Sequence, residues 1–256
     1  MTQRRYCGII PARYASTRFP GKPLTMILGK PMFWYVYTRA KRCSLLTDVV
    51  LATDDERIAL AAEELAVPFV YTASDHQSGS DRVYEAALKL GLSSDTVVVN
   101  IQGDEPALDP AHIACLLTPF FNDPEVRVTT LAYPVQTSAV ENPNRVKVAL
   151  AVNNDALYFS RSPIPYMRNA RPDSGDAVYF GHIGLYAYTL ATLGVFTGLS
   201  QSPLELVEGL EQLRFLENNI PIKVAIVAEP SQAVDVPEDV ARVEQILLSE
   251  NNGNLN

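Results

Sequence analysis

The first part of the chain alternates between short apolar runs and amphipathic stretches. Four apolar runs have the length and composition of buried strands, and they cover residues 6–10, 48–52, 68–71 and 96–101. Between them, apolar side chains recur at the i, i+3, i+4, i+7 spacing that places them on one face of a helix. These three stripes cover residues 33–40, 58–65 and 83–90. Successive strand–helix units predict a parallel sheet with helices packed on it.

The pattern changes after a fourth helical stripe at residues 113–120. From residue 146 to residue 152 every second side chain is apolar, and residues 181–188 form another strand-like run. Alternation of this kind is typical of antiparallel strands with one covered face. We therefore expect antiparallel strands to join the parallel ones in a mixed sheet.

The C-terminal part of the chain returns to helices and a single strand. The pattern predicts a helix over residues 203–217, a strand over 222–227 and a last helix over about 240–247. We find no repeat, linker or low-complexity segment. The expected fold is therefore α/β, with a mixed, mainly parallel central sheet flanked by helices, in one domain of residues 1–248. The polar residues 249–256 are expected to form a frayed tail.

The composition excludes several classes of protein. The 256 residues include 21 basic and 29 acidic side chains, which gives a net charge of −8. Neither nucleic acid nor an anionic membrane surface attracts such a charge, so we expect neither as a partner. No apolar run approaches the roughly 18 residues of a membrane span, and the N-terminus reaches Arg4 before any signal-like apolar segment. Three widely spaced cysteines without a CxxC pair argue against a disulfide framework and a thiolate zinc site, so we expect a cytoplasmic protein.

Basic residues are concentrated at the start of the chain. Residues 1–47 contain nine Lys or Arg side chains and no Asp or Glu. One explanation is a solvated basic face. The other is a basic loop in an acidic protein, which is what the binding of a small polyanion requires. The distribution by itself leaves both explanations open.

The loop after the first predicted strand carries three of these cations. It reads PARYASTRFPGKPL from Pro11 to Leu24 and contains Arg13, Arg18 and Lys22. In open α/β sheets ligands bind beyond the carboxyl ends of the strands, which is where this loop lies. The chain has no GxG and no P-loop motif, so the common dinucleotide and P-loop sites are excluded. The guanidinium and ammonium groups suit a triphosphate, and a solvated basic turn is the alternative.

Two acidic residues are candidate metal ligands. Asp104 follows the buried run that ends at Ile101, at the sheet edge where the basic loop is expected, and Asp235 follows the predicted strand over 222–227. Mg²⁺ prefers one or two carboxylates together with phosphate oxygens and water. As alternatives, Asp104 is a turn former ahead of Pro106, and Asp235 is a residue at the start of a helix.

Eight segments occur in an order that is informative when they are taken together. They read IIPARYASTRFPGKPL, VVLATDDERI, HQSGSDR, VVVNIQGDEP, ALYFSRSPIPY, GHIGLYAYT, SPLELVEGLEQLR and VDVPEDVARVEQ. Over nearly its whole length the chain thereby resembles the bacterial cytidylyltransferases that activate 3-deoxy-manno-octulosonate (Kdo), the CMP-Kdo synthetases. The resemblance implies a Rossmann-like nucleotidyltransferase fold, Mg²⁺ as cofactor and a homodimer. It also implies transfer of CMP from CTP to the anomeric hydroxyl of Kdo, with release of pyrophosphate, for lipopolysaccharide synthesis.

The resemblance further implies roles at the nucleotide. It implies that Arg13, Arg18 and Lys22 bind the phosphates, and that the nucleoside is contacted by Ser78, Gly79, Arg82 and Gln102. Asp104 and Asp235 are implied as the Mg²⁺ ligands. Together with Arg13 and Lys22, these two aspartates form the implied catalytic set.

Four further residues are implied as contacts of the acid sugar, namely Arg161, His182, Glu211 and Gln212. The assignment is chemically sensible, because the sugar has a carboxylate for an arginine and hydroxyls for the other three side chains. The alternatives are a buried, hydrogen-bonded imidazole for His182 and an ordinary exposed helix face for Glu211 and Gln212.

Two positions depart from the family pattern. Ser80 stands where we expect Thr and keeps the hydroxyl, whereas Val236 stands where we expect Thr and loses it, which removes an N-cap worth about 1 kcal/mol. Two rival functions stay open: the same reaction on an 8-amino-octulosonate or a sialic-acid-like sugar, and a catalytically silent nucleotide-binding scaffold. The presence of all three loop cations and both aspartates favours an enzyme.

Overall fold

The computed structural model of the chain describes residues 4–15, 19–168 and 179–253. Contacts between residues group the chain into two compact units: the first contains residues up to 114 and from 231 onward, and the second contains residues 115–230. The chain therefore returns to the first unit after completing the second. The prediction that residues 1–248 form one domain stays a prediction, because a compact unit need not be a domain that folds alone.

The first unit contains a parallel sheet, as the sequence predicts. Its strands are β1 (Tyr6–Ala12), β4 (Asp48–Thr53), β5 (Phe69–Tyr71) and β6 (Val97–Asn100). They are ordered β6-β1-β4-β5, and every neighbouring pair is parallel. Ile9 lies opposite Asn100 in the register of β1 and β6, so the carboxyl ends of these two strands are adjacent. The loops that follow them therefore meet at one edge of the sheet.

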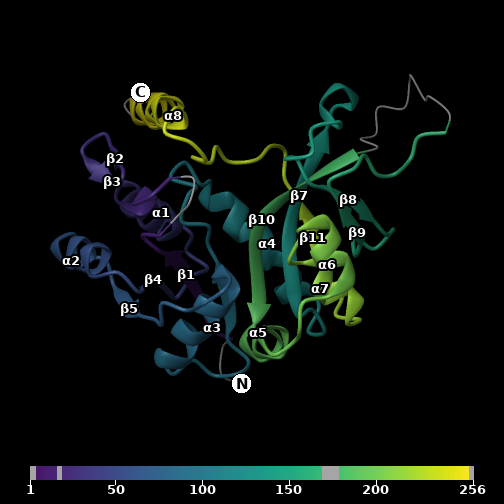
Figure 1. Cartoon of the computed structure of the whole chain (residues 1–256), viewed down its shortest axis with the longest axis horizontal. Helices are drawn as coiled ribbons and strands as arrows, with labels where there is room; N and C mark the ends of the chain where they lie inside the picture. Colours follow the sequence, from purple (N-terminus) through teal and green to yellow (C-terminus); the bar gives the residue numbers. More distant parts are fainter. Residues whose placement is uncertain (1–3, 16–18, 169–178, 254–256) are drawn as a thin grey trace. The chain divides into compact units, whose positions relative to one another are not determined.

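Three helices of the first unit pack with this sheet (Figure 1): α1 (Met32–Ala40), α2 (Glu56–Glu64) and α3 (Gly79–Lys89). The predicted stripes are their buried faces, because Phe33, Ile58 and Val83 are each 0% exposed. Helix α4 (Pro110–Asn122) follows β6 and contains the boundary between the two units. None of the helices in the described ranges has the length and apolar character needed to cross a membrane.

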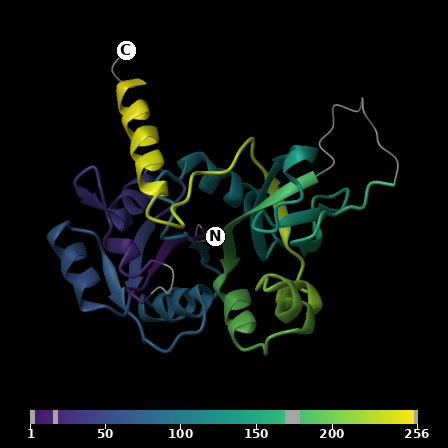
Figure 2. The same cartoon turned by 45° about the horizontal axis from the view of Figure 1, so that its top comes forward.

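The last helix, α8 (Asp239–Gly253), packs in the first unit beside the short hairpin of β2 (Met26–Ile27) and β3 (Lys30–Pro31) (Figure 2). It shares an apolar cluster with the N-terminal segment through buried Ile27, Met32, Val243 and Leu247. The helix continues to Gly253, so the predicted helix over about 240–247 is too short, and residues 254–256 lie outside the described residues.

The second unit contains the antiparallel pairs that alternation predicts. Its strands are β7 (Val128–Val135), β8 (Lys147–Leu150), β9 (Ala156–Ser160), β10 (Tyr179–Thr189) and β11 (Lys223–Ile226). Strand β10 pairs antiparallel with β7 and β8, β8 pairs antiparallel with β9, and β11 pairs parallel with β7. The mixed character of the strands is confirmed. The alternating apolar pattern over 146–152 predicted a longer strand than β8, which ends at Leu150. Val152 lies beyond it and is fully exposed.

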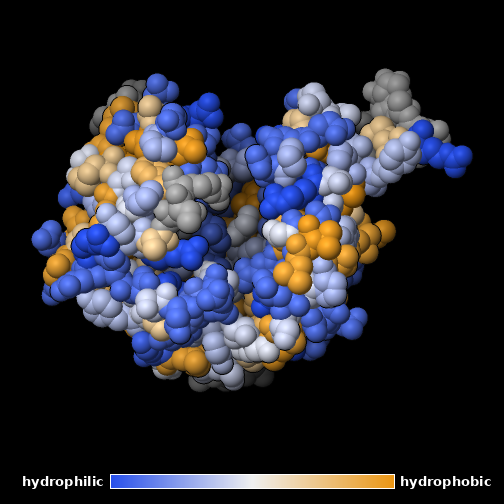
Figure 3. All heavy atoms as spheres, in the orientation of Figure 1, coloured by the Kyte–Doolittle hydropathy of each residue, from blue (hydrophilic) through white to orange (hydrophobic). Residues whose placement is uncertain are grey.

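The predicted helix over 203–217 is wrong, because this segment forms two helices. Helix α6 (Pro203–Glu208) ends at Gly209, whose φ of 62° is left-handed, and α7 (Leu213–Glu217) begins after a turn. A left-handed glycine is the common end of a helix. The apolar side chains Leu204, Leu206 and Val207 of α6 are exposed, and Figure 3 shows an apolar surface over this helix. The unit is completed by α5 (Leu190–Thr197) and the 3₁₀ helix η2 (Thr137–Ala139).

Candidate functional site

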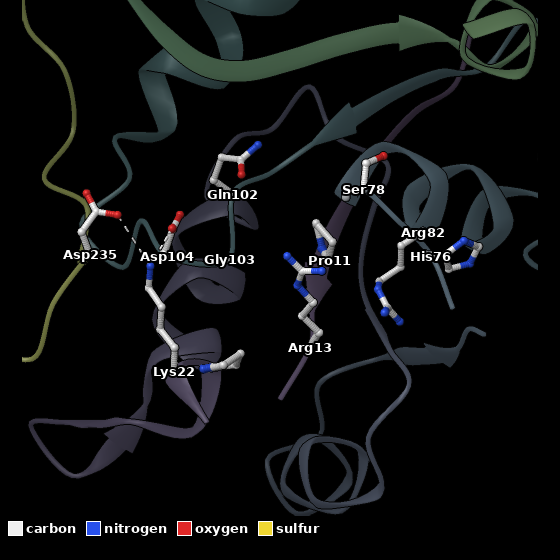
Figure 4. A pocket seen from close by; sticks show the side chains of 12 residues that line it. Pro11, Arg13, Lys22, His76, Ser78, Arg82, Gln102, Gly103, Asp104 and Asp235 are labelled. Carbon is white, nitrogen blue, oxygen red and sulfur yellow. Dashed lines mark hydrogen bonds and ion pairs between the residues drawn. The ribbon is translucent and has the colours of Figure 1, made fainter. Parts of the chain in front are cut away.

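A pocket of about 280 Å³ opens in the first unit at the carboxyl ends of β1 and β6. Eight of the residues that the sequence selects line it (Figure 4): Arg13, Lys22, Ser78, Gly79, Arg82, Gln102, Asp104 and Asp235. The other lining residues are Pro11, Pro23, His76 and Gly103. The structure therefore brings together the described members of the predicted nucleotide and metal sets. Their individual roles stay predictions.

One end of the pocket is built around the ammonium group of Lys22. Its Nζ lies 2.7 Å from Oδ2 of Asp104 and 4.0 Å from Oδ1 of Asp235 (Figure 4). Lys22 opens the 3₁₀ helix η1 (Lys22–Leu24), Asp104 lies in the loop after β6, and Asp235 precedes α8. Segments far apart in the sequence thus place two carboxylates around one cation.

Glu105 adds a third acid that sequence reasoning missed, although it stands beside a selected residue. The side chain is 9% exposed, and within the described structure its Oε2 has no hydrogen-bond partner. Burial raises the pKa of Glu105 to about 8, and the charges of Asp104 and Asp235 add to the increase. Two carboxylates therefore line this end of the pocket, and the buried carboxyl group of Glu105, the next residue after Asp104, favours its neutral form near pH 7.

The donor set fits Mg²⁺ that arrives with a phosphate-bearing substrate. The side chains of Asp104 and Asp235 are 35% and 66% exposed, so their oxygens are open to a ligand. Among the described residues, no group of three or more His, Cys, Asp or Glu side chains is arranged to hold a metal ion by itself. Mg²⁺ commonly takes one or two carboxylates and completes its shell with phosphate oxygens and water. Two convergent aspartates satisfy that requirement.

The other end of the pocket is the N-terminus of α3. Ser78 is the N-cap: its Oγ accepts from the backbone N–H of Asp81 at 3.2 Å, and the Asp81 carboxylate accepts from the Ser78 N–H at 3.1 Å. This reciprocal capping box explains the local sequence SGSD. Ser80, the departure from the family pattern, is buried within the first turn of the helix. The cap fixes Ser78 and Gly79 at the pocket wall.

Arg82 lies one turn further along α3 with its guanidinium committed to protein groups. The side chain is 3% exposed, its Nη2 lies 3.2 Å from Oδ2 of Asp54, and its Nη1 donates to Oγ1 of Thr72. An arginine has five N–H donors, so these contacts leave others for a ligand. The structure therefore ties Arg82 to the residues that directly follow β4 and β5, as well as placing it at the pocket.

His76 also lines the pocket and was missed, although it begins the HQSGSDR motif. Its Nε2 hydrogen-bonds to Oε2 of Glu85. Burial by itself raises the pKa of Glu85, but hydrogen bonds from Lys89, His76 and the Ala73 backbone outweigh it and hold the pKa at about 2. The carboxylate is therefore an acceptor only, so the Nε2 of His76 carries a proton. The imidazole orientation follows from this bond.

The loop between β1 and η1 is closed by a backbone bond and an aromatic contact. The N–H of Gly21 donates to the carbonyl of Tyr14 at 2.9 Å, and Gly21 has a φ of +71°. The guanidinium of Arg57 lies 3.3 Å from the centre of the Tyr14 ring. The side chain of Arg13 is exposed at the pocket. Arg18, the third predicted cation, lies outside the described residues.

Gly103 allows the loop after β6 to approach the carboxyl end of β1 closely. A Cβ at this position would lie 2.9 Å from the backbone carbonyl oxygen of Pro11. No side-chain rotation relieves such a contact, so either the loop that carries Gly103 or the end of β1 must move.

We expect Gly103→Ala to lower stability by about 1–3 kcal/mol and to raise the KM for the nucleotide. Urea unfolding and steady-state kinetics measure both effects. Gly198→Ala is the matched control, because its Cβ meets nothing nearer than 3.5 Å. Equal behaviour of the two variants would show that the close approach is unimportant.

The predicted sugar-binding residues lie in the second unit, where Arg161 is held by backbone carbonyls. Its guanidinium donates to the carbonyls of Glu208 at 2.8 Å, Pro143 at 3.1 Å and Gly209 at 3.3 Å. The Glu208 carboxylate accepts from the backbone N–H of Arg161 at 2.9 Å and from the hydroxyl of Ser160 at 2.6 Å. Arg161 is thereby fixed, with its charge balanced by carbonyl dipoles, and it retains N–H donors for a substrate carboxylate.

His182 lies on β10 between the rings of Phe159 and Tyr186. Burial lowers its pKa to about 3, so the imidazole is neutral. Its Nε2 lies 3.0 Å from Oγ1 of Thr130, which is also within 3.1 Å of the Ile183 carbonyl. A hydroxyl that donates to that carbonyl accepts from the Nε2–H, which leaves Nδ1 as an acceptor. The buried-imidazole alternative fits this geometry, and so does acceptance of a substrate hydroxyl.

Glu211 and Gln212 lie in the turn between α6 and α7. Gln212 is 7% exposed and Glu211 is partly buried, so the alternative of an ordinary exposed helix face is wrong. Burial raises the pKa of Tyr186, and the charges of Tyr188 and Glu211 raise it further. The left-handed Gly209 that breaks the helix is what turns both residues inward.

The chain is similar to proteins of known activity over nearly all of its length. The model of a family described as cytidylyltransferase matches residues 7–224. A 3-deoxy-manno-octulosonate cytidylyltransferase of Nitratidesulfovibrio vulgaris is 55% identical over 254 residues, which cover 99% of this chain and 100% of the relative. The corresponding protein of Bacteroides thetaiotaomicron is 46% identical over 249 residues, covering 95% of this chain and 98% of the relative.

A solved structure extends the comparison to the fold. CMP:2-keto-3-deoxy-manno-octonic acid synthetase in complex with CTP matches with a TM-score of 0.89 at 39% identity, covering 96% of this chain and 99% of that one. The match confirms the predicted α/β nucleotidyltransferase fold.

Proposed function

Since the chain belongs to the family of 3-deoxy-manno-octulosonate cytidylyltransferases, we propose that Lys22, Asp104 and Asp235 form the centre at which it acts. The protein is a nucleotidyltransferase that transfers CMP from CTP to Kdo, and pyrophosphate is the second product. The observation that carries the proposed centre is the convergence of two carboxylates on one ammonium group at the carboxyl edge of the sheet. No covalent nucleophile is needed, because the sugar hydroxyl attacks the α-phosphorus directly.

At the triphosphate end, the chain contributes charge and position. Lys22 and Arg13 would neutralise phosphate oxygens, and Asp104 and Asp235 would hold Mg²⁺. When bound, Mg²⁺ polarises phosphate oxygens and lowers the pKa of a hydroxyl that approaches it. Charge that develops on the α-phosphate and on the leaving pyrophosphate is stabilised by side chains that are already in place. Arg18 belongs to this set by the family pattern.

The nucleoside is assigned to the opposite end of the pocket. We propose that Ser78, Gly79, Arg82 and Gln102 contact it, with the capped start of α3 as the wall. The acid sugar is assigned to Arg161, His182, Glu211 and Gln212 of the second unit. Arg161 then meets the sugar carboxylate, and the Nδ1 of His182 accepts a hydrogen bond from a sugar hydroxyl.

Pyrophosphate release from CTP tests this function. We expect turnover with Kdo, little or none with a sialic acid, and none after exhaustive chelation. If the enzyme preferred an 8-amino-octulosonate in this assay, that sugar and not Kdo would be its substrate. Absence of turnover with every acid sugar would favour a nucleotide-binding scaffold.

The setting of the reaction is part of the proposal. A CMP-activated Kdo is a donor for lipopolysaccharide synthesis, and the three cysteines are free thiols, which suits the reducing cytoplasm. Family membership supports a homodimer, and we expect sedimentation velocity to give twice the monomer mass of 28.1 kDa. A fully active monomer at assay concentration contradicts the dimer and leaves the chemistry untouched.

A further inference from the structure

The segment that carries Asp235 has no helix or strand of its own to fix it. Asp235 and Val236 lie in a bend between β11 and α8, and both are exposed. The preceding residue anchors one side of the bend: Val234 is 0% exposed, and its N–H donates to the carbonyl of Asp104 at 2.9 Å. This bond ties the backbones of the two proposed ligand segments to each other.

A single carboxylate anchors the other side of the bend. Oδ2 of Asp239 accepts from the N–H of Asp235 at 2.9 Å and from the N–H of Val236 at 3.1 Å. Val236 and Asp239 have capping-box spacing in the turn that leads into α8, where the N–H of Asp239 donates to the carbonyl of Val236 at 3.0 Å. In a full capping box the residue at the position of Val236 also contributes a side-chain oxygen. Valine has no side-chain oxygen. In this chain, therefore, the carboxylate of Asp239 is the side-chain group that holds the bend on this side.

Asp239 is itself fixed, because it begins a helix that is hydrogen-bonded to the N-terminal part of the first unit at two further points. The guanidinium of Arg39 donates to both carboxylate oxygens of Glu250, at 2.5 and 3.1 Å. The N–H of Leu28 donates to Oε1 of Glu244 at 3.0 Å. The carboxylate of Asp239 therefore acts from a rigid support.

We propose that Asp239 is a positioning residue that holds the backbone of Asp235 so that its carboxylate faces Lys22 and Asp104. The inference rests on the proposed function, in which Asp235 is a metal ligand. Side chains that orient metal ligands typically change metal affinity by about 10- to 100-fold when they are removed. Asp239 reaches the metal site through the backbone of Asp235.

The experiment titrates Mn²⁺ into protein and CTP at a one-to-one ratio and follows free Mn²⁺ by electron paramagnetic resonance, with CTP alone at the same concentration as the baseline. We expect Asp239→Ala to weaken Mn²⁺ binding by about 10-fold or more. Glu238→Ala is the matched control, because this neighbouring acid is exposed, and we expect it to bind Mn²⁺ like the unsubstituted chain. Asp235→Asn is the reference for loss of the ligand itself.

A second substitution separates positioning from helix capping. Val236→Thr in the Asp239→Ala background restores an N-cap oxygen and should recover thermal stability, but it gives the N–H of Asp235 no acceptor. We expect Mn²⁺ binding to stay weak in this double variant. Recovery of both properties would overturn the inference in favour of capping alone. If Asp235→Asn weakens binding and Asp239→Ala does not, the inference fails by itself, whereas unchanged binding in Asp235→Asn removes the proposed metal site.

Discussion

Replacing Asp104 or Asp235 by asparagine is expected to lower kcat by about 10² to 10³, and replacing both is expected to add little. The magnitude follows from the loss of one preorganised charge at a centre where phosphate charge develops. Because both carboxylates lie around Lys22, at 2.7 and 4.0 Å from its Nζ, they are placed to bind one ion. Residues that serve one function are strongly non-additive when they are removed.

The three variants are compared by pre-steady-state CMP transfer at several Mg²⁺ concentrations, with thermal unfolding as the folding control. Similar residual rates in the single and double variants support a shared ion. If the losses multiply and the unfolding temperature falls in step, the two aspartates have the turn and helix-start roles that the sequence left open.

Much of the fold of the first unit could be predicted from sequence, because the spacing of its apolar residues and the rules of strand connection determine it. Buried runs of strand length alternate with amphipathic stripes, and this arrangement has few solutions other than a parallel sheet. The same rule places the loops after β1 and β6 at one edge, so the proximity of Lys22 and Asp104 was derivable. Asp235 was not derivable in this way, because it reaches the pocket only after the chain has passed through the second unit.

Other parts of the site depend on tertiary contacts, which the spacing of apolar residues does not encode. The residues of 203–217 have helical composition, and only the left-handed conformation of Gly209 shows why Glu211 and Gln212 turn inward. The burial of Glu105 and the pairing of His76 with Glu85 follow from packing around the pocket. Arg161 carries the expected charge, but no pattern in the sequence predicts that three backbone carbonyls accept hydrogen bonds from its guanidinium.

The family pattern therefore supplied what the physical pattern lacked. Periodicity located the loops, their charged side chains suggested a triphosphate and a metal, and the order of the motifs added CTP and an acid sugar as the substrates. The structure then showed that Ser78, a predicted nucleoside contact, is also the cap of α3, and that Arg82 is also an internal ion-pair partner. Both residues thus combine a fold-forming contact with a place at the pocket, which sequence patterns do not distinguish.

Lys22→Met is expected to lower kcat/KM for CTP by about 10² to 10³ while making Mn²⁺ binding without CTP tighter. The methionine keeps most of the apolar stem and removes the ammonium group that neutralises phosphate. The same ammonium pairs with Asp104 at 2.7 Å, where it opposes the approach of a metal cation. Loss of Lys22 and loss of either aspartate should therefore change metal affinity in opposite directions, although both reduce turnover.

Lys30→Met is the control, because it removes one positive charge from the same basic segment. Lys30 is exposed, with its Nζ 5.7 Å from the centre of the Trp34 ring, and it does not line the pocket. If the concentration of charge at the start of the chain served only as a solvated basic face, the two lysine variants would behave alike and would respond equally to salt. A specific phosphate contact predicts a large effect for Lys22 only, together with a weak salt dependence, because its side chain is 15% exposed and is poorly screened.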